Sequence, residues 1–356
     1  MAIAFPLRLA APLFAIAAVA GSAAAGTPEL PAPPGTLLVG NKAANTLWRL
    51  SLADGQRLGE APTAPAPHEI VVSRDGRIAV VSEYGHREPG HTLGVYDAHA
   101  GQLLRRIDLG ANTRPHGMRF THDGGHLLVT TEGSDALLQV RLDGRIERVF
   151  DIGPGKGHML ALSPDGRHAY VAKVEAGTVA RVELATGEVL EKPAGDGAEG
   201  IAVARDGSVW VSNREADTVT VHDPETLDVI ATLDSPGFPI RVGFSADGQH
   251  ALVTNARAAT LGVFSVLQRR PLAVVALAEP GAEYRQTMLG RAALPIGAVA
   301  DPDGRRVYVA ISGGNQVAVV DTARWKVVER WSTGDEPDAL AIVPPAPAAA
   351  PAHAAP

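Results

Sequence analysis

The dipeptide Asp-Gly returns at a nearly constant interval along most of this 356-residue chain. Each copy follows an alternating apolar run, and successive copies lie 48, 42, 41, 41 and 56 residues apart, beginning at Asp75, Asp123, Asp165, Asp206, Asp247 and Asp303. A period of about 40 residues with turn chemistry at one fixed position is typical of a repeat architecture. Asp-Gly between alternating runs also predicts a hairpin, because Gly adopts the positive φ of a tight primed turn.

Each repeat is predicted to hold four strands, and the number of strands of each kind indicates that the repeats close into a ring. Seven segments fit the second strand: "LLVGN", "AVVSE", "LLVTT", "AYVAK", "VWVSN", "ALVTN" and "VYVAI". Only six segments fit the first strand before an Asp-Gly, and the seventh, "DALAIV" at 338–343, stands at the other end of the chain. If that strand completes the N-terminal unit, no sheet edge of an open array is left exposed.

The sequence therefore predicts an all-β fold, a seven-bladed β-propeller over 36–343 closed by its C-terminal strand. A β-sandwich and an open solenoid are the alternatives, but neither explains a strand missing at one end and spare at the other.

Two of the repeats carry a family resemblance. "GIAVARDGSVWVSNREADTVTVHDPETLDVIATL" and "GAVADPDGRRVYVAISGGNQVAVVDTARWKVVERW" resemble the YVTN repeats of the lactonase-like and surface-layer group of seven-bladed propellers. The resemblance covers almost all of 37–343 and implies the fold. It leaves function open, because the family holds enzymes, binding proteins and unassigned exported proteins together. No contiguous motif lets the family's catalytic residues be carried over to this chain.

The two ends of the chain differ from the repeats. Residues 1–25 are predicted to be a signal peptide, with Arg8, the apolar stretch "LAAPLFAIAAVAG" and small residues up to Ala25. A linker at 26–35 follows, and 344–356 are predicted to be a disordered Pro/Ala-rich tail. We therefore expect a periplasmic or secreted protein with no membrane span. We expect no nucleic-acid partner, because the net charge of the chain is -7. We also expect it to be a monomer.

The candidate site comes from one alignment column. The residues seven positions before each Asp-Gly are His68, His116, His158, Glu199, Ile240 and Ile296, and the closing strand places Asp338 in the same column. In a closed ring Asp338 neighbours His68, so five consecutive blades present Asp, His, His, His and Glu where their innermost strands begin. We expect these five residues at the mouth of the central channel.

Imidazoles beside carboxylates suit either metal binding or proton transfer. The predicted metal ligands are His68, His116, His158, Glu199 and Asp338, and zinc, copper or nickel is the expected ion. The catalytic candidates are His116, Glu199 and Glu83. The alternative is that the histidines only pack or hydrogen-bond at the rim, since YVTN repeats often open with "PHG"-like sequences. No organic cofactor is expected, and with no cysteine in the chain thiolate sites are excluded.

A second group of residues is predicted at the same mouth. It holds the last residues of the second strands (Asn41, Glu83, Thr131, Lys173, Asn213, Asn255 and Ile311) and two insertions, 84–91 and 279–295. Glu132, Lys173, Glu175 and Arg114 lie near it and are expected to be solvated charges.

Two functions remain open on the sequence. The favoured one is an exported propeller that binds a metal ion or small polar ligand, or a protein partner, at this mouth. The other is a metal-assisted lactonase-like hydrolase or lyase that uses the same face. A role as partner of an exported redox enzyme is a third possibility.

Overall fold

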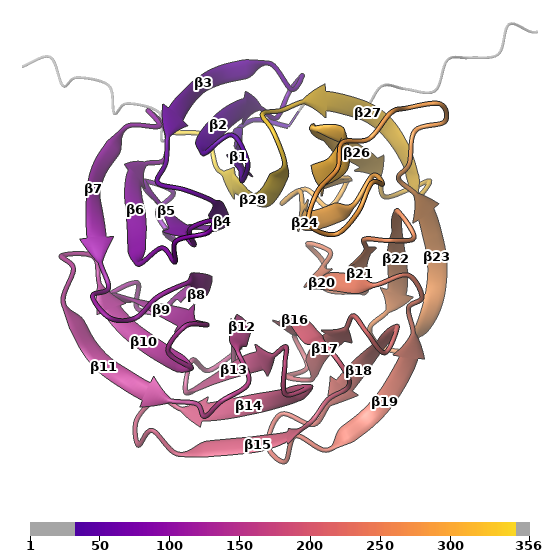
Figure 1. Cartoon of the computed structure of the whole chain (residues 1–356). Coiled ribbons are helices and arrows are strands. Elements are labelled where there is room, and N and C mark those ends of the chain that lie inside the picture. The colour runs from indigo at the N-terminus through magenta and orange to yellow at the C-terminus, as the bar shows by residue number, and fades with distance from the viewer. Residues whose placement is uncertain (1–32, 347–356) are drawn as a thin grey trace, which may run out of the picture. The chain divides into compact units, whose positions relative to one another are not determined.

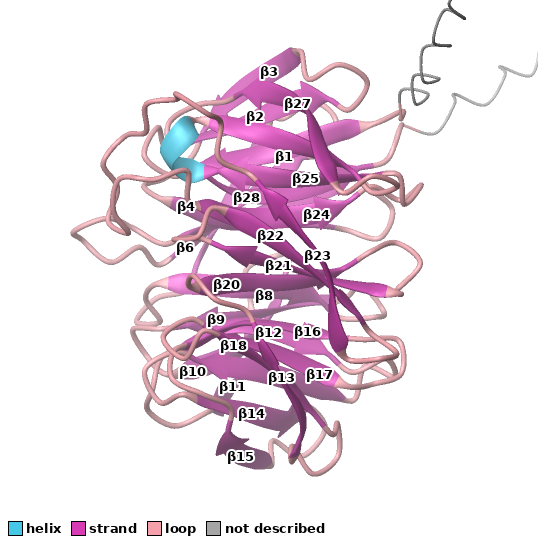
Figure 2. Cartoon of the chain, turned by 90° about the vertical axis from the view of Figure 1, so that its right-hand side faces the viewer, coloured by secondary structure: helices cyan, strands magenta, loops and turns pink. Residues whose placement is uncertain are grey.

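The protein forms seven four-stranded antiparallel sheets set as blades around a central axis, in a computed structural model that describes residues 33–346 (Figure 1). The predicted seven-bladed β-propeller is confirmed. A side view shows strands and loops with one short 3-10 turn, η1 (Ser312–Gly314) (Figure 2). Within 33–346 no helix is long and apolar enough to cross a membrane. The predicted signal peptide, the linker up to residue 32 and the tail from residue 347 lie outside the described residues.

The blades follow one another along the chain, and the four strands of each are given from the axis outward. Blade 1 holds β28 (Pro337–Val343), β1 (Thr36–Asn41), β2 (Thr46–Ser51) and β3 (Arg57–Pro62). Blade 2 holds β4 (Pro67–Val72), β5 (Ile78–Glu83), β6 (Thr92–Asp97) and β7 (Leu103–Asp108). Blade 3 holds β8 (Pro115–Phe120), β9 (His126–Thr131), β10 (Ala136–Arg141) and β11 (Ile146–Asp151). Blade 4 holds β12 (Gly157–Leu162), β13 (His168–Lys173), β14 (Thr178–Glu183) and β15 (Val189–Pro193).

The remaining three blades repeat this order. Blade 5 holds β16 (Ala198–Val203), β17 (Val209–Asn213), β18 (Thr218–His222) and β19 (Val229–Asp234). Blade 6 holds β20 (Pro239–Phe244), β21 (His250–Asn255), β22 (Thr260–Ser265) and β23 (Arg270–Ala276). Blade 7 holds β24 (Pro295–Ala300), β25 (Arg306–Ile311), β26 (Gln316–Asp321) and β27 (Lys326–Ser332).

The ring closes in blade 1, as the strand count predicts. The last strand, β28, pairs antiparallel with β1, so that Val343 lies opposite Thr36 and Ala341 opposite Leu38. Strands from the two ends of the chain thus lie side by side (Figure 1). Since β28 also packs against the inner strands of both neighbouring blades, β4 and β24, this pairing removes both edges of the array.

The hairpins form at the Asp-Gly dipeptides, but the turn is not the two-residue primed turn that was expected. In blade 2 the Gly76 amide donates to the Ser73 carbonyl at 2.8 Å, and Gly76 has φ +72° while Asp75 does not have positive φ. The Asp75 carboxylate accepts from the Ser73 hydroxyl at 2.6 Å and from the Arg77 amide at 3.1 Å. Asp therefore stabilises a four-residue turn through its side chain, and Gly supplies the left-handed residue that follows.

The second strand of each blade explains why the repeats are so apolar. Five of these strands, β1, β5, β9, β13 and β21, are buried at every residue but the first, because both faces pack on neighbouring blades. The outermost strands are mostly exposed: β7 buries only Ile107 and β11 only Phe150. The core is therefore a set of interfaces between blades, with the inner strands left to line the channel.

Candidate functional site

The seven column residues are each the second residue of an inner strand. In every blade the pairing register of the inner strand shifts at this point, between Pro67 and Ile70 in blade 2 and between Pro115 and Met118 in blade 3, for example. Such a bulge leaves residues unpaired and re-aims their side chains. We call the end of the channel where the inner strands begin the mouth, and the structure places the five polar column residues there.

Those five residues form a continuous arc, as the sequence predicts. Asp338 Oδ2 lies 3.0 Å from His68 Nδ1. The His68 and His116 ring centroids lie 4.3 Å apart, and those of His116 and His158 lie 3.6 Å apart. His158 Nε2 lies 3.2 Å from Glu199 Oε1. The structure thus brings together all five predicted ligands, each in contact with the next.

His158 is held between two carboxylates. Its Nδ1 is bonded to Glu132 Oε1, while its Nε2 faces Glu199. Burial alone lowers the pKa of His158, but Glu132 and Glu199 outweigh burial and raise this pKa to about 9. Burial raises the pKa of Glu199, but His158 and the guanidinium groups of Arg241 and Arg214 lower it to about 2. Without a metal, this part of the arc is a buried imidazolium with two carboxylates.

His116 is the opposite case. Its side chain is fully buried, and neither of its ring nitrogens has a hydrogen-bond partner among the described residues. Burial, and then the charges on His158 and His68, hold the pKa of His116 well below 6.5. A buried polar group without a partner is rare in a native protein and indicates a ligand, ion or water at that place. His116 is therefore a neutral imidazole, with one ring nitrogen that can accept a ligand and one N–H that can donate.

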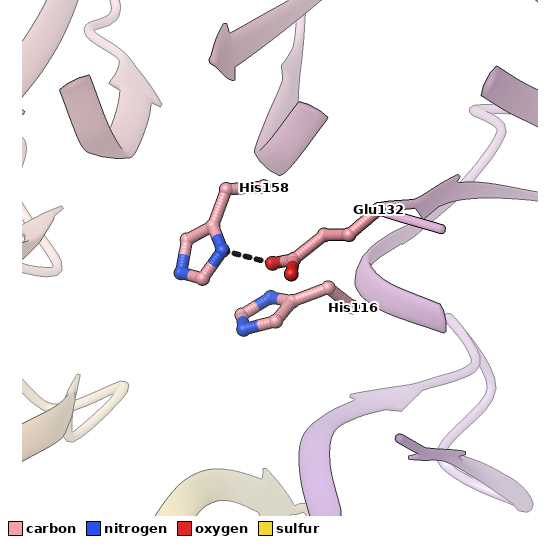
Figure 3. A group of neighbouring side chains, drawn as sticks. All are labelled: His116, Glu132 and His158. Atoms are coloured by element: carbon pink, nitrogen blue, oxygen red, sulfur yellow. Dashed lines mark hydrogen bonds and ion pairs between the residues drawn. The ribbon is translucent and has the colours of Figure 1, made fainter. Parts of the chain in front are cut away.

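One subset of the arc has the spacing of a metal site. One ligand atom each from His116, Glu132 and His158 lie within 4.8 Å of one another (Figure 3). Glu132 directly follows β9, and its other oxygen accepts from the Tyr84 hydroxyl at 2.6 Å. Two imidazoles and one carboxylate match the ligand types of catalytic zinc sites that keep open positions.

Glu132 was expected to be a solvated charge, and that expectation is wrong: the residue is only 8% exposed. The same expectation fails for Lys173, which is buried and donates to Glu191 at 2.9 Å and to the Ile152 carbonyl at 2.8 Å. Glu175 is exposed, as expected. Both predictions assumed that a charged side chain is exposed. Lys173 ends the second strand of its blade and Glu132 follows one, and the blades bury the ends of these strands.

The last residues of the second strands, the second group predicted at the mouth, do not contact the arc. Asn41, Asn213 and Asn255 donate instead to the threonine that opens the third strand of their own blade, at 3.1, 3.2 and 3.2 Å. Asn213 and Asn255 lie opposite Ala198 and Pro239, the residues just before the column, and their side chains bond within their own blade.

Glu83, a catalytic candidate, belongs to the same group. Its carboxylate accepts from the Ala64 amide at 2.8 Å, the Thr92 hydroxyl at 2.5 Å and Arg106 Nε at 3.2 Å. These bonds hold Glu83 inside blade 2.

The first insertion contributes one residue to the arc. The Tyr84 ring lies edge-on to His68 and His116, with centroid distances of 4.9 and 5.7 Å. Its histidines bond elsewhere, His86 to Asn45 at 3.0 Å and His91 to Asp108 at 2.9 Å. In the second insertion Arg285 pairs with Asp335 at 2.9 Å.

Sequence reasoning missed the cations and the carboxylate that complete the arc. Lys42 pairs with Asp338 at 3.0 Å, and Arg214 pairs with Glu199 at 2.6 Å. Arg241 Nη2 lies 2.6 Å from Glu69 Oε1, and its Nη1 lies 3.4 Å from Glu199. Glu69 and Arg241 each directly follow a column residue, at the bulge of their inner strand. The position after each column residue was the signal that could have found them.

Comparison with known proteins agrees with this fold. Residues 110–272 match the family model described as lactonase, 7-bladed beta-propeller. Two curated relatives, the uncharacterized protein YncE of Salmonella typhi and of Salmonella typhimurium, are 28% and 26% identical over 138 and 136 residues. Each match covers 37% of this chain and 36% of the relative, so the chain spans about a third of the relatives' length.

Solved structures match over more of the chain. The periplasmic gluconolactonase of Pseudomonas aeruginosa has a TM-score of 0.68 at 22% identity, over 87% of this chain and 99% of that one. A putative 6-phosphogluconolactonase of Bacteroides fragilis has a TM-score of 0.69 at 16% identity, over 89% and 100%. Kuenenia stuttgartiensis hydrazine synthase has a TM-score of 0.65 at 17% identity, over 77% and 88%. At these identities the likeness shows the fold alone. The predicted resemblance to lactonase-like seven-bladed propellers is confirmed by the family model that matches residues 110–272.

Proposed function

We propose that this seven-bladed β-propeller, which resembles the lactonase-like propellers, binds a divalent transition metal at the mouth through His116, His158 and Glu132. The observation that carries this proposal is His116, a fully buried neutral imidazole with no partner for either nitrogen. Its nearest possible co-ligands are a second imidazole and a carboxylate at metal-binding spacing. Zinc, copper and nickel all accept this set of ligands.

Metal binding at this place must displace a proton. His158 is held as an imidazolium in the metal-free arc, and only its neutral form can bind a metal. A dication compensates for that loss, because Glu132 and Glu199 lie on the two sides of His158 and favour positive charge there. Binding therefore exchanges one buried cation for another.

The rest of the arc supports the three ligands. Tyr84 donates to Glu132 and fixes that carboxylate beside His158. Asp338 faces His68, whose ring lies against His116. Hydrogen-bonded neighbours of this kind orient metal ligands and set their affinity. His68, Glu199 and Asp338, which the sequence places among the ligands, take supporting roles in this proposal.

We assign the site to binding, as an exported propeller that holds the metal or a small polar ligand attached to it, or docks a protein partner there. The side chains of His68 and His158 remain 17% and 11% exposed, so a small polar group can reach the arc from the mouth. Export and a monomeric state are parts of this proposal.

A metal-assisted hydrolase is the second candidate. Three protein ligands leave coordination positions free for water, and a zinc-bound water reaches a pKa of about 7. Glu199 lies next to the group and is ionised, so it is placed to accept a proton. Hydrolysis of gluconolactone by the metal-loaded protein, lost in Glu199→Gln with the metal retained, would support this candidate over simple binding.

The test of the proposed site is elemental analysis of the protein purified from its exporting host. We expect about one equivalent of metal in the native protein and none in His116→Ala. The matched control is His126→Ala, which removes another imidazole paired with a glutamate: His126 begins β9 and lies 2.7 Å from Glu147 of β11. It should keep the metal. Native protein that stays metal-free after incubation with zinc, copper or nickel would overturn the proposal.

A further inference from the structure

The central channel is divided in two by an ion pair. Arg241 lies on β20 in blade 6 and Glu69 on β4 in blade 2, and these blades are not neighbours in the ring. Their 2.6 Å contact therefore crosses the channel. The histidine arc lies on the mouth side of this bridge. On the other side is a cavity of about 500 Å³, which we call the rear chamber, lined by Glu69, Arg241 and later residues of the inner strands.

The wall of the rear chamber combines a ring of apolar side chains with polar atoms, which form the larger part of its exposed surface. Half-buried apolar side chains from six blades face it: Phe120, Leu162, Val203, Phe244, Val299 and Leu340. They are only half-buried because they border the cavity. A concave site of this size that sets apolar side chains beside a few charged groups can hold a small molecule.

One charge in the rear chamber has no counter-ion. Arg119 of β8 donates to the Met118 carbonyl at 2.8 Å, and no carboxylate lies within ion-pair distance of it in the part of the chain that the structure describes. Glu69, whose charge acts on Arg119, is already paired with Arg241. Burial lowers the pKa of the Arg119 guanidinium, which indicates a charge that the protein leaves poorly solvated.

The surface beside the chamber is also basic. A depression of about 590 Å³ shares Arg119, Phe120 and His122 with the rear chamber and includes Arg74. Arg119 thus stands where the outer depression meets the inner cavity. An incoming anion would meet positive groups first and apolar surface beyond them.

We propose that the rear chamber binds a small organic anion, with its acidic group on Arg119 and its apolar body inside the ring of six apolar side chains. A planar guanidinium binds carboxylates and related oxyanions through paired hydrogen bonds, which are stronger than those to neutral groups. Glu69 and the apolar wall disfavour a ligand with several charges. This site is separate from the metal site, and neither proposal depends on the other.

The probe is 8-anilinonaphthalene-1-sulfonate, an aromatic anion that fluoresces in apolar surroundings, titrated into the full-length mature protein. Arg119→Met keeps the length of the side chain and removes its charge. We expect saturable binding of one dye per native chain and at least tenfold weaker binding to Arg119→Met. Arg105→Met, at an exposed position on β7, should bind like the native protein. The uncharged analogue N-phenyl-1-naphthylamine should bind native protein and Arg119→Met alike.

A second variant keeps the test decisive if Arg119→Met fails to fold. Gly243 of β20 lines the chamber, and a Cβ added there meets no atom within 4 Å. Gly243→Leu should fill the chamber and abolish binding of both dyes, while its metal content stays that of the native protein. Absence of saturable dye binding to the native protein, or equal affinity in Gly243→Leu, would overturn the proposal.

Discussion

Asp338 Oδ2 lies 3.0 Å from His68 Nδ1, and this contact joins β28, the inner strand of blade 1, to β4, the inner strand of blade 2. The same strand, β28, completes blade 1 by pairing with β1. Ring closure and assembly of the histidine arc are therefore one event. A chain that cannot close lacks one end of the arc as well.

Truncation tests the closure. Removing all residues after Glu336 deletes β28 and exposes β1 and the faces of two neighbouring blades, so we expect cooperative unfolding to be lost. Removing only the residues after Pro344 leaves β28 intact and should leave the melting temperature unchanged. Circular dichroism during heating distinguishes the two. The closure is not needed for stability if both truncated proteins melt with the native transition.

A glycine beside the column tests how closely the inner strands pack. A Cβ on Gly297 would lie 2.2 Å from the Asp338 carbonyl oxygen of the next blade. We expect Gly297→Ala to lower the free energy of unfolding by about 1–3 kcal/mol through overpacking. Gly243→Ala is the matched control, because its Cβ meets open space. Chemical denaturation measures both, and equal stabilities would contradict the packing at this seam.

The bridge across the channel should matter more to stability than a surface ion pair. Arg241→Met removes the positive charge that pairs with the buried carboxylates of Glu69 and Glu199. We expect a loss of about 3–5 kcal/mol in the free energy of unfolding. Arg57→Met removes an exposed pair with Glu60 and should cost less than about 1 kcal/mol. Urea denaturation compares them. A similar small loss in both variants would show that the bridge is not formed in solution.

The pH dependence of stability tests the His158 contacts. Its folded pKa of about 9 lies above the usual 6.5, so its contribution is complete below about pH 6.5 and is lost as the pH rises through 9. We expect metal-free native protein to be more stable than His158→Gln at pH 6, by on the order of 2–3 kcal/mol. This difference should shrink toward pH 9.5. Unfolding curves across this range measure it, and a constant difference would rule out the charged form of His158.

The fold could be predicted from the sequence because its signals repeat. Each Asp-Gly and each apolar second strand appears at the same place in successive units, and the unequal strand count identified β28 as the closing strand. The column residues His68, His116 and His158 followed from the same alignment. They share one position in the repeat, and the ring brings equal positions together.

The rest of the site could not be predicted, because it depends on side-chain direction. Glu132 turns back to His158 from the end of β9, while Glu83, at the end of the neighbouring β5, turns into its own blade. The two residues differ by one position in the repeat. Glu69 and Arg241 could have been found as the residues that follow the column, but no local pattern records that they pair across the channel.

The bulge at the start of every inner strand has a consequence for how a chain like this can acquire new chemistry. It presents one side chain from each blade at the same height in the mouth, and in this chain two of the seven, Ile240 and Ile296, are apolar. At these two positions the inner strand has the same bulge as in the blades that carry a histidine or a carboxylate. Point mutations can therefore add or remove a binding group one blade at a time while the scaffold stays the same. Each blade thus offers evolution and design one replaceable side-chain position at the mouth.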